Sequence, residues 1–223
     1  MLTKRRMAVL ATALLVAAGS SYSVSAMARP GGGGGGGELV PLSVDEEAGL
    51  QFMREEEKLA RDSYIVLGDL WGLPVFANIS ESEQSHMNGV KQMLGKYQVP
   101  DPISDESDVG SFVDPELQAL FDDLMAAGED SVMAALYVGG TIEETDMEDI
   151  QHWIDLADHE DIIGVYESLL CGSRNHLRAF VKQIENRGAV YEARVLPQDV
   201  VDAIADSPTE RDCGSGGGGG GRR

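Results

Sequence analysis

Hydrophobic residues recur at alternating spacings of three and four positions through most of residues 43–190. This spacing is typical of helices that bury one face, and no stretch alternates convincingly with the two-residue period of a strand. The pattern predicts four long helices, at about 43–70, 74–97, 131–157 and 158–187. We therefore expect an all-α protein with no sheet of any size.

Residues with strong end preferences mark the limits of these helices. Ser43, followed by Glu46 three positions later, forms the capping-box pattern that begins a helix. The sequence Gly72-Leu73-Pro74 separates the first two helices, and Gly188 follows the fourth. One last short helix is expected within residues 197–206.

The lengths of the connections predict how the helices are arranged. Short turns join the first helix to the second and the third to the fourth, so each pair should be antiparallel. Residues 98–130 form a long connection between the second and third helices, and within it a short helix is expected from Asp114-Pro115 to Gly128. Two antiparallel pairs joined by one long crossover are typical of the ferritin-like four-helix bundle. We expect that fold, with the short extra helix in the crossover.

Two polar residues interrupt the apolar face of the second predicted helix. Burying Glu83 and His86 without partners would be costly, so each needs a partner or a metal ion. A Glu and a His three positions later on an inward face are a metal-ligand element of di-metal carboxylate bundles. A surface ion pair or a hydrogen-bonded core histidine is the alternative. The inward positions of this helix are Ile79, Glu83, His86, Val90, Met93 and Tyr97.

Each of the other three long helices also carries a ligand-type side chain on its apolar face. Glu57 lies on the first, Glu143 on the third and His176 on the fourth. Glu144 is the alternative to Glu143, and Tyr64 is a candidate hydrogen-bond donor to a ligand, with core packing as its alternative. A buried polar network without metal is the other interpretation, with Tyr64, Arg61, Arg174 and water as the partners. The expected metal ligands are Glu57, Glu83, His86, Glu143 and His176.

The fourth helix lacks the acid that a symmetric site would have. Ser173 stands three positions before His176, whereas a symmetric di-metal site draws a bridging carboxylate from each Glu-x-x-His. We expect Glu83 to bridge, with Glu57 and Glu143 as terminal ligands. From the ligand count, the half of the site around Glu143 should bind metal less tightly than the half around Glu57.

The chain is strongly acidic, with 38 Asp and Glu residues against 17 Lys and Arg residues and a formal net charge of -21. This charge argues against nucleic acid or an anionic membrane surface as a partner, and it is compatible with the attraction of cations. The sequence gives little support for a hydrolytic enzyme, because it contains no Gly-x-Ser-x-Gly nucleophile motif. His152 and His159 have no evident nucleophile nearby, and we expect both to be exposed.

The two ends of the chain differ in composition from its centre. Residues 1–28 combine a basic start, a short apolar run and an ending in small residues, which is typical of a secretory signal, with an uncleaved anchor as the alternative. A Gly-rich linker is expected over 29–42, the bundle over 43–190, and a tail with a short helix and a Gly-rich end over 191–223. We expect an exported protein, periplasmic or extracellular, without membrane contact after signal cleavage.

The only two cysteines are Cys171, in the fourth predicted helix, and Cys213, in the tail. In an oxidising compartment they could pair, and the sequence leaves this open.

Several segments carry a resemblance to known families. Glu57-Lys58-Leu59-Ala60-Arg61-Asp62-Ser63-Tyr64 resembles the first-helix motif of rubrerythrin-type ferritin-like proteins. The resemblance to the uncharacterised family called domain of unknown function 2202 covers about residues 43–190. It implies a ferritin-like bundle with an iron site and supplies no activity. The segments that carry it are 52–62, 78–87, 142–146 and 172–180.

The sequence supports two functional hypotheses, which belong to different classes of protein. The first is an exported ferritin-like protein that binds one or two iron ions, with manganese or zinc as alternatives, and that could act as a di-iron oxidase or ferroxidase if two ferrous ions fit. The second is a metal-free structural or interaction module that uses the bundle as a scaffold, with its acidic connection, Asp146 and Asp149 as solvated surface. The protein could also assemble as a homodimer.

Overall fold

The computed structural model describes residues 40–211 and 213, and within them it is entirely helical, with no strand. This confirms the all-α prediction. The expected secretory signal, most of the expected linker and the C-terminal glycine run lie outside the described residues. The helices are α1 Val44–Trp71, α2 Pro74–Tyr97, α3 Pro115–Gly128, α4 Val132–Leu156, α5 Glu160–Glu185 and α6 Gln198–Ala205.

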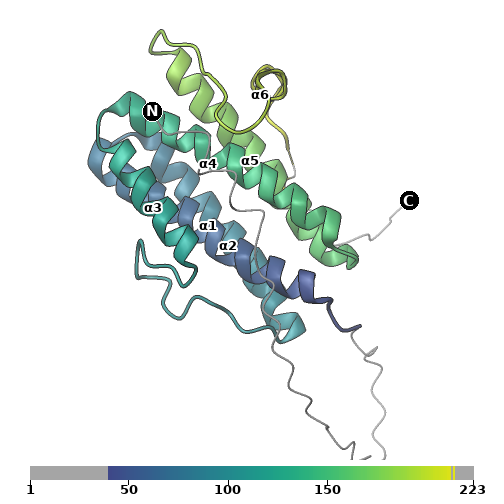
Figure 1. Cartoon of the computed structure of the whole chain (residues 1–223). Helices are drawn as coiled ribbons and strands as arrows, with labels where there is room; N and C mark the ends of the chain where they lie inside the picture. The colour runs from purple at the N-terminus through teal and green to yellow at the C-terminus, as the bar shows by residue number, and fades with distance from the viewer. Residues whose placement is uncertain (1–39, 212, 214–223) are drawn as a thin grey trace, which may run out of the picture. The chain divides into compact units, whose positions relative to one another are not determined.

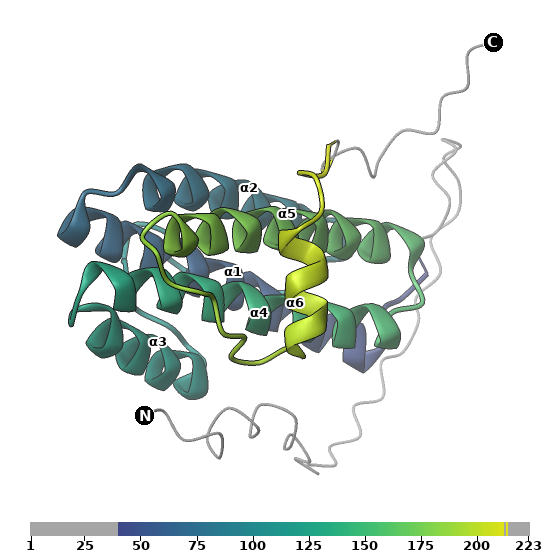
Figure 2. The ribbon, with the colours of Figure 1, turned by 90° about the horizontal axis from the view of Figure 1, so that it is seen from above.

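The four long helices pack side by side, as Figure 1 shows. The tightest pairs are α1 with α2 and α4 with α5, and the pairs meet because α1 also contacts α4 and α2 contacts α5. The long connection between α2 and α4 contains α3, which packs against α1 and α4. Figure 2 shows α6 lying across α5 rather than along it.

The residues that the sequence marks as helix ends cap and end the helices in the structure, with one small shift at the start of α5. Ser43 Oγ accepts from the backbone N–H of Glu46, and the Glu46 side chain accepts from the backbone N–H of Ser43, so the capping box is complete. Gly72 ends α1 in a left-handed conformation with φ 64°, which glycine adopts without steric cost. The α5 helix begins at Glu160 rather than near Asp158. The physical reason is that Glu46 Oε1 binds the backbone N–H groups of Asp158 and His159, just ahead of the helix.

Two apolar clusters fill the space between the long helices. One contains an aromatic group in which the ring centroids of Tyr64, Phe76 and Phe180 lie 5.3–6.1 Å apart. The other includes Leu50 from α1 and Leu169 from α5. Along α1, α2 and α5, buried polar residues stand between the residues of one cluster and those of the other, so a polar layer of the bundle lies between the clusters. The expected ligands occupy this layer.

The acidic connection after α2 is not simply solvated surface. It folds over α1, where Arg54 forms an ion pair with Asp101 at 3.2 Å and also pairs with Glu106. Lys58 Nζ donates to the backbone oxygens of Asp108 and Ser111 at 2.7 and 3.1 Å. These contacts explain why α1 buries charged residues on more than one face.

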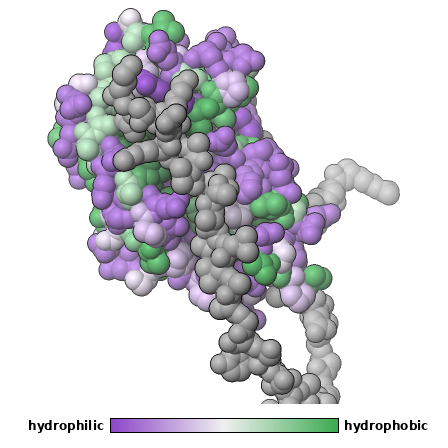
Figure 3. Space-filling model, in the orientation of Figure 1, coloured by the Kyte–Doolittle hydropathy of each residue, from purple (hydrophilic) through white to green (hydrophobic). Residues whose placement is uncertain are grey.

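The C-terminal segment is fastened to α5. Cys171 and Cys213 form a disulfide, which answers the question that the sequence left open. Glu210 binds the guanidinium groups of Arg174 and Arg178. Within residues 40–211 and 213, no helix is long and apolar enough to cross a bilayer. On the face drawn in Figure 3, hydrophilic residues predominate and hydrophobic residues are interspersed among them.

Candidate metal centre

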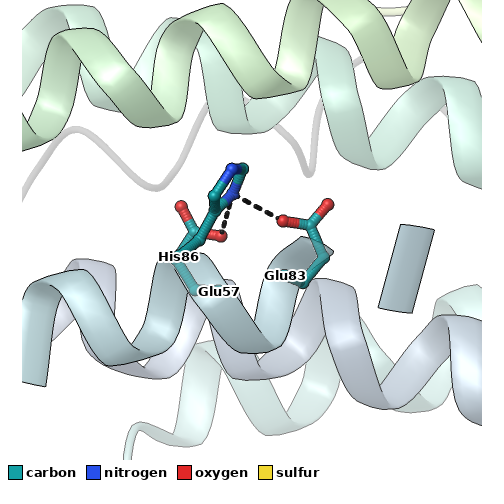
Figure 4. Close-up of side chains that lie close together, drawn as sticks. All are labelled: Glu57, Glu83 and His86. Atoms are coloured by element: carbon teal, nitrogen blue, oxygen red, sulfur yellow. Dashed lines mark hydrogen bonds and ion pairs between the residues drawn. The ribbon is translucent and has the colours of Figure 1, made fainter. Parts of the chain in front are cut away.

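The first half of the centre is built by α1 and α2. Glu83 and His86 lie three residues apart on α2 and therefore project from one face toward Glu57 of α1 (Figure 4). His86 Nδ1 lies 3.1 Å from Glu57 Oε2 and 2.7 Å from Glu83 Oε2. The three side chains each offer one ligand atom within 4.8 Å of the others. They form the first triad.

The second half is built around the same Glu83. His176, from α5, has its Nδ1 2.8 Å from Glu83 Oε1 and 3.3 Å from Oε2 of Glu143, on α4. Glu83, Glu143 and His176 form the second triad, again with ligand atoms within 4.8 Å of one another. Each oxygen of Glu83 thus faces a different histidine, and the two imidazole rings stack with centroids 5.5 Å apart.

The geometry of these close contacts fits cation ligands. Glu57, Glu83 and Glu143 are only 1–2% exposed. Among the described residues, Glu57 Oε1, Glu83 Oε2 and His176 Nδ1 have no hydrogen-bond partner, although Glu83 Oε2 and His176 Nδ1 lie within 2.8 Å of a ligand-type atom. Buried polar atoms are rarely left without a partner. His86 Nδ1 shares a hydrogen bond with Glu57 Oε2, and carboxylate oxygens and imidazole nitrogens that converge in this way are a donor set suited to a divalent metal ion.

Neighbouring groups hold the outer atoms of the ligands. Tyr64 donates its hydroxyl hydrogen to Glu143 Oε1, as the sequence analysis suggested. Ser82 Oγ lies 2.9 Å from His176 Nε2, which fixes the ring with Nδ1 toward Glu83. Ser82 was missed from the sequence because nothing marks one serine of α2 as facing another helix.

The charges of the cluster shift the titration of its members. Burial opposes protonation of His86 and His176, but the surrounding carboxylates outweigh it, so the pKa of His86 lies well above the usual range and that of His176 at about 10. Burial raises the pKa of Glu57 to about 7. The nearby His86 acts to lower this pKa, and the negative charge of Glu83 acts to raise it. Burial acts to raise the pKa of Glu83, but the positive charges of His176 and His86 outweigh burial and lower it. Without metal, protons therefore occupy the histidines.

The structure also separates the alternatives that the sequence left open. Glu144 faces away from the triads, because it accepts from Tyr191 Oη at 2.6 Å and from the backbone N–H groups of residues 194–196. Arg61 binds Asp62 and Gln84, and Arg174 binds Glu210. Of the side chains named for a metal-free network, only Tyr64 contacts the triads.

Buried acids lie beside the triads where the scaffold hypothesis placed Asp146 and Asp149 on solvated surface. Asp146, on α4, is 4% exposed, and its Oδ2 accepts from Ser173 Oγ at 2.5 Å. Glu56 is also buried and shares a hydrogen bond with the half-buried Asp149, and burial raises the pKa of both acids. The signal was present for Asp146, because it follows Glu143 by three residues, the spacing of the Glu-x-x-His element.

One of the two histidines expected to be exposed is not. His152 is exposed, but His159 is half-buried, with its Nδ1 2.7 Å from Glu46 Oε1. The expectation for His159 was wrong because the capping carboxylate of α1 lies beside the start of α5 and covers it.

Comparisons with known proteins identify relatives without assigning an activity. A protein family described as "Uncharacterized protein domain (DUF2202)" matches residues 46–208. The uncharacterized protein MJ0754 of Methanocaldococcus jannaschii is 47% identical over 171 residues, which cover 77% of this chain and 92% of that protein. The crystal structure of the hypothetical protein MJ0754 aligns with a TM-score of 0.75 at 45% identity, over 79% of this chain and 100% of that one.

Proposed function

The chain belongs to the DUF2202 family, whose description assigns no activity, and from its own site we propose that it binds a pair of divalent metal ions, iron first, inside a ferritin-like four-helix bundle. The observation that carries this proposal is the position of Glu83. Its two oxygens face two histidines from different helices, and each pair is accompanied by one further buried glutamate. A carboxylate shared in this way suits a bridge between two cations.

The type of donor favours iron or manganese. The five side chains offer three carboxylates and two imidazoles, a set that suits iron and manganese, while zinc usually takes a closed set of four nitrogen and sulfur ligands in structural sites. Glu57 and Glu143 would be the terminal ligands, and His86 and His176 the nitrogen ligands. Manganese and zinc remain alternatives that metal analysis distinguishes.

The order of the ligands along the chain supports the ferritin-like arrangement. The four long helices carry Glu, then Glu-x-x-His, then Glu, then His, and the long connection with α3 lies between the second and third of them. In di-iron carboxylate bundles, facing helices contribute Glu and Glu-x-x-His ligands to the core in the same manner. The two apolar clusters on either side of the polar layer would keep bulk water from the centre.

A pair of ferrous ions would supply electrons for reaction with dioxygen or peroxide, which makes ferroxidase or oxidase activity the proposed chemistry. The protein's own part is positional. Tyr64 holds Glu143 through its hydroxyl and Ser82 holds the ring of His176, while Glu83 would offer its carboxylate to the metal pair.

Export to the periplasm or the cell exterior is part of the same proposal. A disulfide is typical of proteins that fold in an oxidising compartment, and Cys171–Cys213 supports that location. The excess of acidic residues supports metal cations rather than nucleic acid as partners. Assembly as a homodimer remains a proposal that light scattering on the purified protein would test.

The direct test is metal content by plasma mass spectrometry on protein produced with iron, manganese and zinc all supplied. We expect close to two ions of iron or manganese per chain, and their loss in the double variant Glu83→Ala/His86→Ala. If neither protein contains metal while both keep the helical fold, a metal-free scaffold becomes the better supported function. In that case the double variant should be more stable than the parent, because it removes buried charge.

A further inference from the structure

A fourth buried carboxylate lies beside the two triads, and the proposed site does not yet use it. Asp146 accepts one hydrogen bond, from Ser173 Oγ to its Oδ2 at 2.5 Å. Its Oδ1 is buried and has no hydrogen-bond partner in the described part of the chain. A carboxylate is costly to bury in ionised form unless a cation or further donors compensate its charge. Asp146 therefore needs a cation or a proton at Oδ1.

The positions of Asp146 and Ser173 relate this carboxylate to the ligands. Asp146 follows Glu143 by three residues and so lies one turn farther along the same side of α4. Ser173 precedes His176 by three residues on α5, where a symmetric site would carry its second bridging acid. The hydroxyl at the position of the absent acid thus holds a carboxylate that comes from the neighbouring helix.

The charges that act on Asp146 are those of the triads. After burial, the largest influences on its carboxyl group are the negative charges of Glu57, Glu143 and Glu83, in that order, and all raise its pKa. These three glutamates come from α1, α4 and α2. The negative charges that act most strongly on Asp146 therefore come from both triads.

We propose that Asp146 is a further metal-binding carboxylate, which replaces the acid absent at position 173, and that Ser173 is the residue that positions it. This inference rests on the proposed function. Asp146 is a member of neither triad, and the atom that we assign to the metal pair is its free Oδ1, while Oδ2 keeps its bond to Ser173.

The balance of charge supports the assignment. The triads contain three carboxylates, which leave two divalent cations with one positive charge uncompensated. With Asp146 the centre has four carboxylates and becomes neutral, which a buried site favours because uncompensated charge is costly there. The centre also gains a fourth carboxylate, which makes up for the acid absent at position 173.

The test is a titration of the purified full-length protein with Mn²⁺, followed by the electron paramagnetic resonance signal of free Mn²⁺. The parent protein should bind two ions. Asp146→Asn should bind the second ion at least tenfold more weakly. Asp149→Asn, which removes an acid one turn away on the same helix, is the matched control and should bind like the parent.

An exchange of the acid between helices tests the role directly. The double variant Asp146→Ala/Ser173→Glu returns the carboxylate to α5 and should recover two tightly bound ions. Ser173→Ala keeps the carboxylate, removes only its donor, and should weaken the second ion several-fold, which keeps the proposal testable if Asp146→Asn folds poorly. Circular dichroism reports the folding of each variant.

The outcomes separate this inference from the proposed function. If the parent binds two ions and Asp146→Asn binds them equally tightly, Asp146 is no ligand and only the inference fails. If the parent binds no Mn²⁺, Fe²⁺ or Zn²⁺, both fail together. A crystal structure of the Mn²⁺-loaded protein with Oδ1 of Asp146 turned away from the ions would also overturn the inference.

Discussion

Gly172 leaves room for the imidazole of His86: a Cβ built at position 172 would lie 2.4 Å from His86 Nε2 and 2.5 Å from its Cε1. Glycine weakens a helix interior by roughly 1 kcal/mol relative to alanine. Its presence in the middle of α5 is explained by the ring that packs against it, since no larger residue leaves that ring in contact with Glu57 and Glu83.

Substitution of this glycine should therefore damage the proposed metal centre. Gly172→Ala should lower Mn²⁺ affinity at least tenfold, because the displaced His86 no longer directs Nδ1 at the first triad. The control is Gly95→Ala on α2, where a Cβ meets nothing within 4 Å. That change should leave metal binding alone and raise the free energy of unfolding by about 0.5–1 kcal/mol. Equal metal affinities in the two variants would contradict the assigned role of His86.

The three glutamates of the triads should not be equivalent. Glu83→Gln removes the carboxylate that both triads share, so we expect almost no bound Mn²⁺. Glu57→Gln and Glu143→Gln each alter one triad and should retain about one ion per chain. The measurement is the number of Mn²⁺ ions bound at saturation. A Glu83→Gln protein that still binds one ion tightly would show that Glu83 is not a bridge.

Metal affinity should increase with pH. In the metal-free protein His176 has a pKa of about 10 and His86 one well above its usual range, so between pH 6 and 8 both imidazoles carry protons that a bound ion must displace. Each displaced proton should change the affinity by about tenfold per pH unit. Calorimetric titrations in buffers of different ionisation enthalpy count these protons. An affinity that is constant from pH 6 to 8 would mean that the histidines are not ligands.

Glu46 should make stability depend on pH through its position between α1 and α5. Burial acts to raise its pKa, but the backbone N–H of Ser43 and the groups of His159 and Asp158 lower it to about 2. A depressed pKa means that the stabilisation is present above the ordinary value near 4.5 and is lost as the pH falls toward 2. Glu46→Gln should cost about 1–3 kcal/mol at pH 7 and much less at pH 2.

The matched control for this prediction is Glu47→Gln. Glu47 stands in the same first turn of α1 but is exposed. Urea unfolding at pH 7 and pH 2 compares the two variants with the parent. If the cost of Glu46→Gln stays the same at both pH values, the ionised carboxylate is not what joins the two helices.

Helical periodicity explains why so much of the centre could be anticipated. Once Glu57, Glu83 and His176 lie on the inward faces of their helices, packing of those helices turns them toward the same interior. The level at which they meet depends on the lengthwise alignment of the helices. The same periodicity favoured Glu143 over Glu144, and the structure has Glu143 in the second triad and Glu144 bound to the C-terminal segment.

Contacts that depend on how neighbouring helices and loops fold together could not be derived in this way. The bond between Ser173 and Asp146 depends on the relative height of α4 and α5. The burial of Arg54 depends on the path of the connection that returns over α1. His159 was expected to be exposed because nothing within its own segment shows that Glu46, more than a hundred residues earlier, would bind it.

The polar layer between the two apolar clusters also restricts how the helices can slide past one another. A shift of any long helix by one turn, about 5.4 Å, would move its carboxylate or imidazole out of the layer and into apolar surroundings such as those of Phe180 or Leu50. A buried polar residue is known to fix the register of coiled coils by the same cost. The buried polar layer therefore aligns the four helices, and this alignment is the one in which the proposed ligands meet.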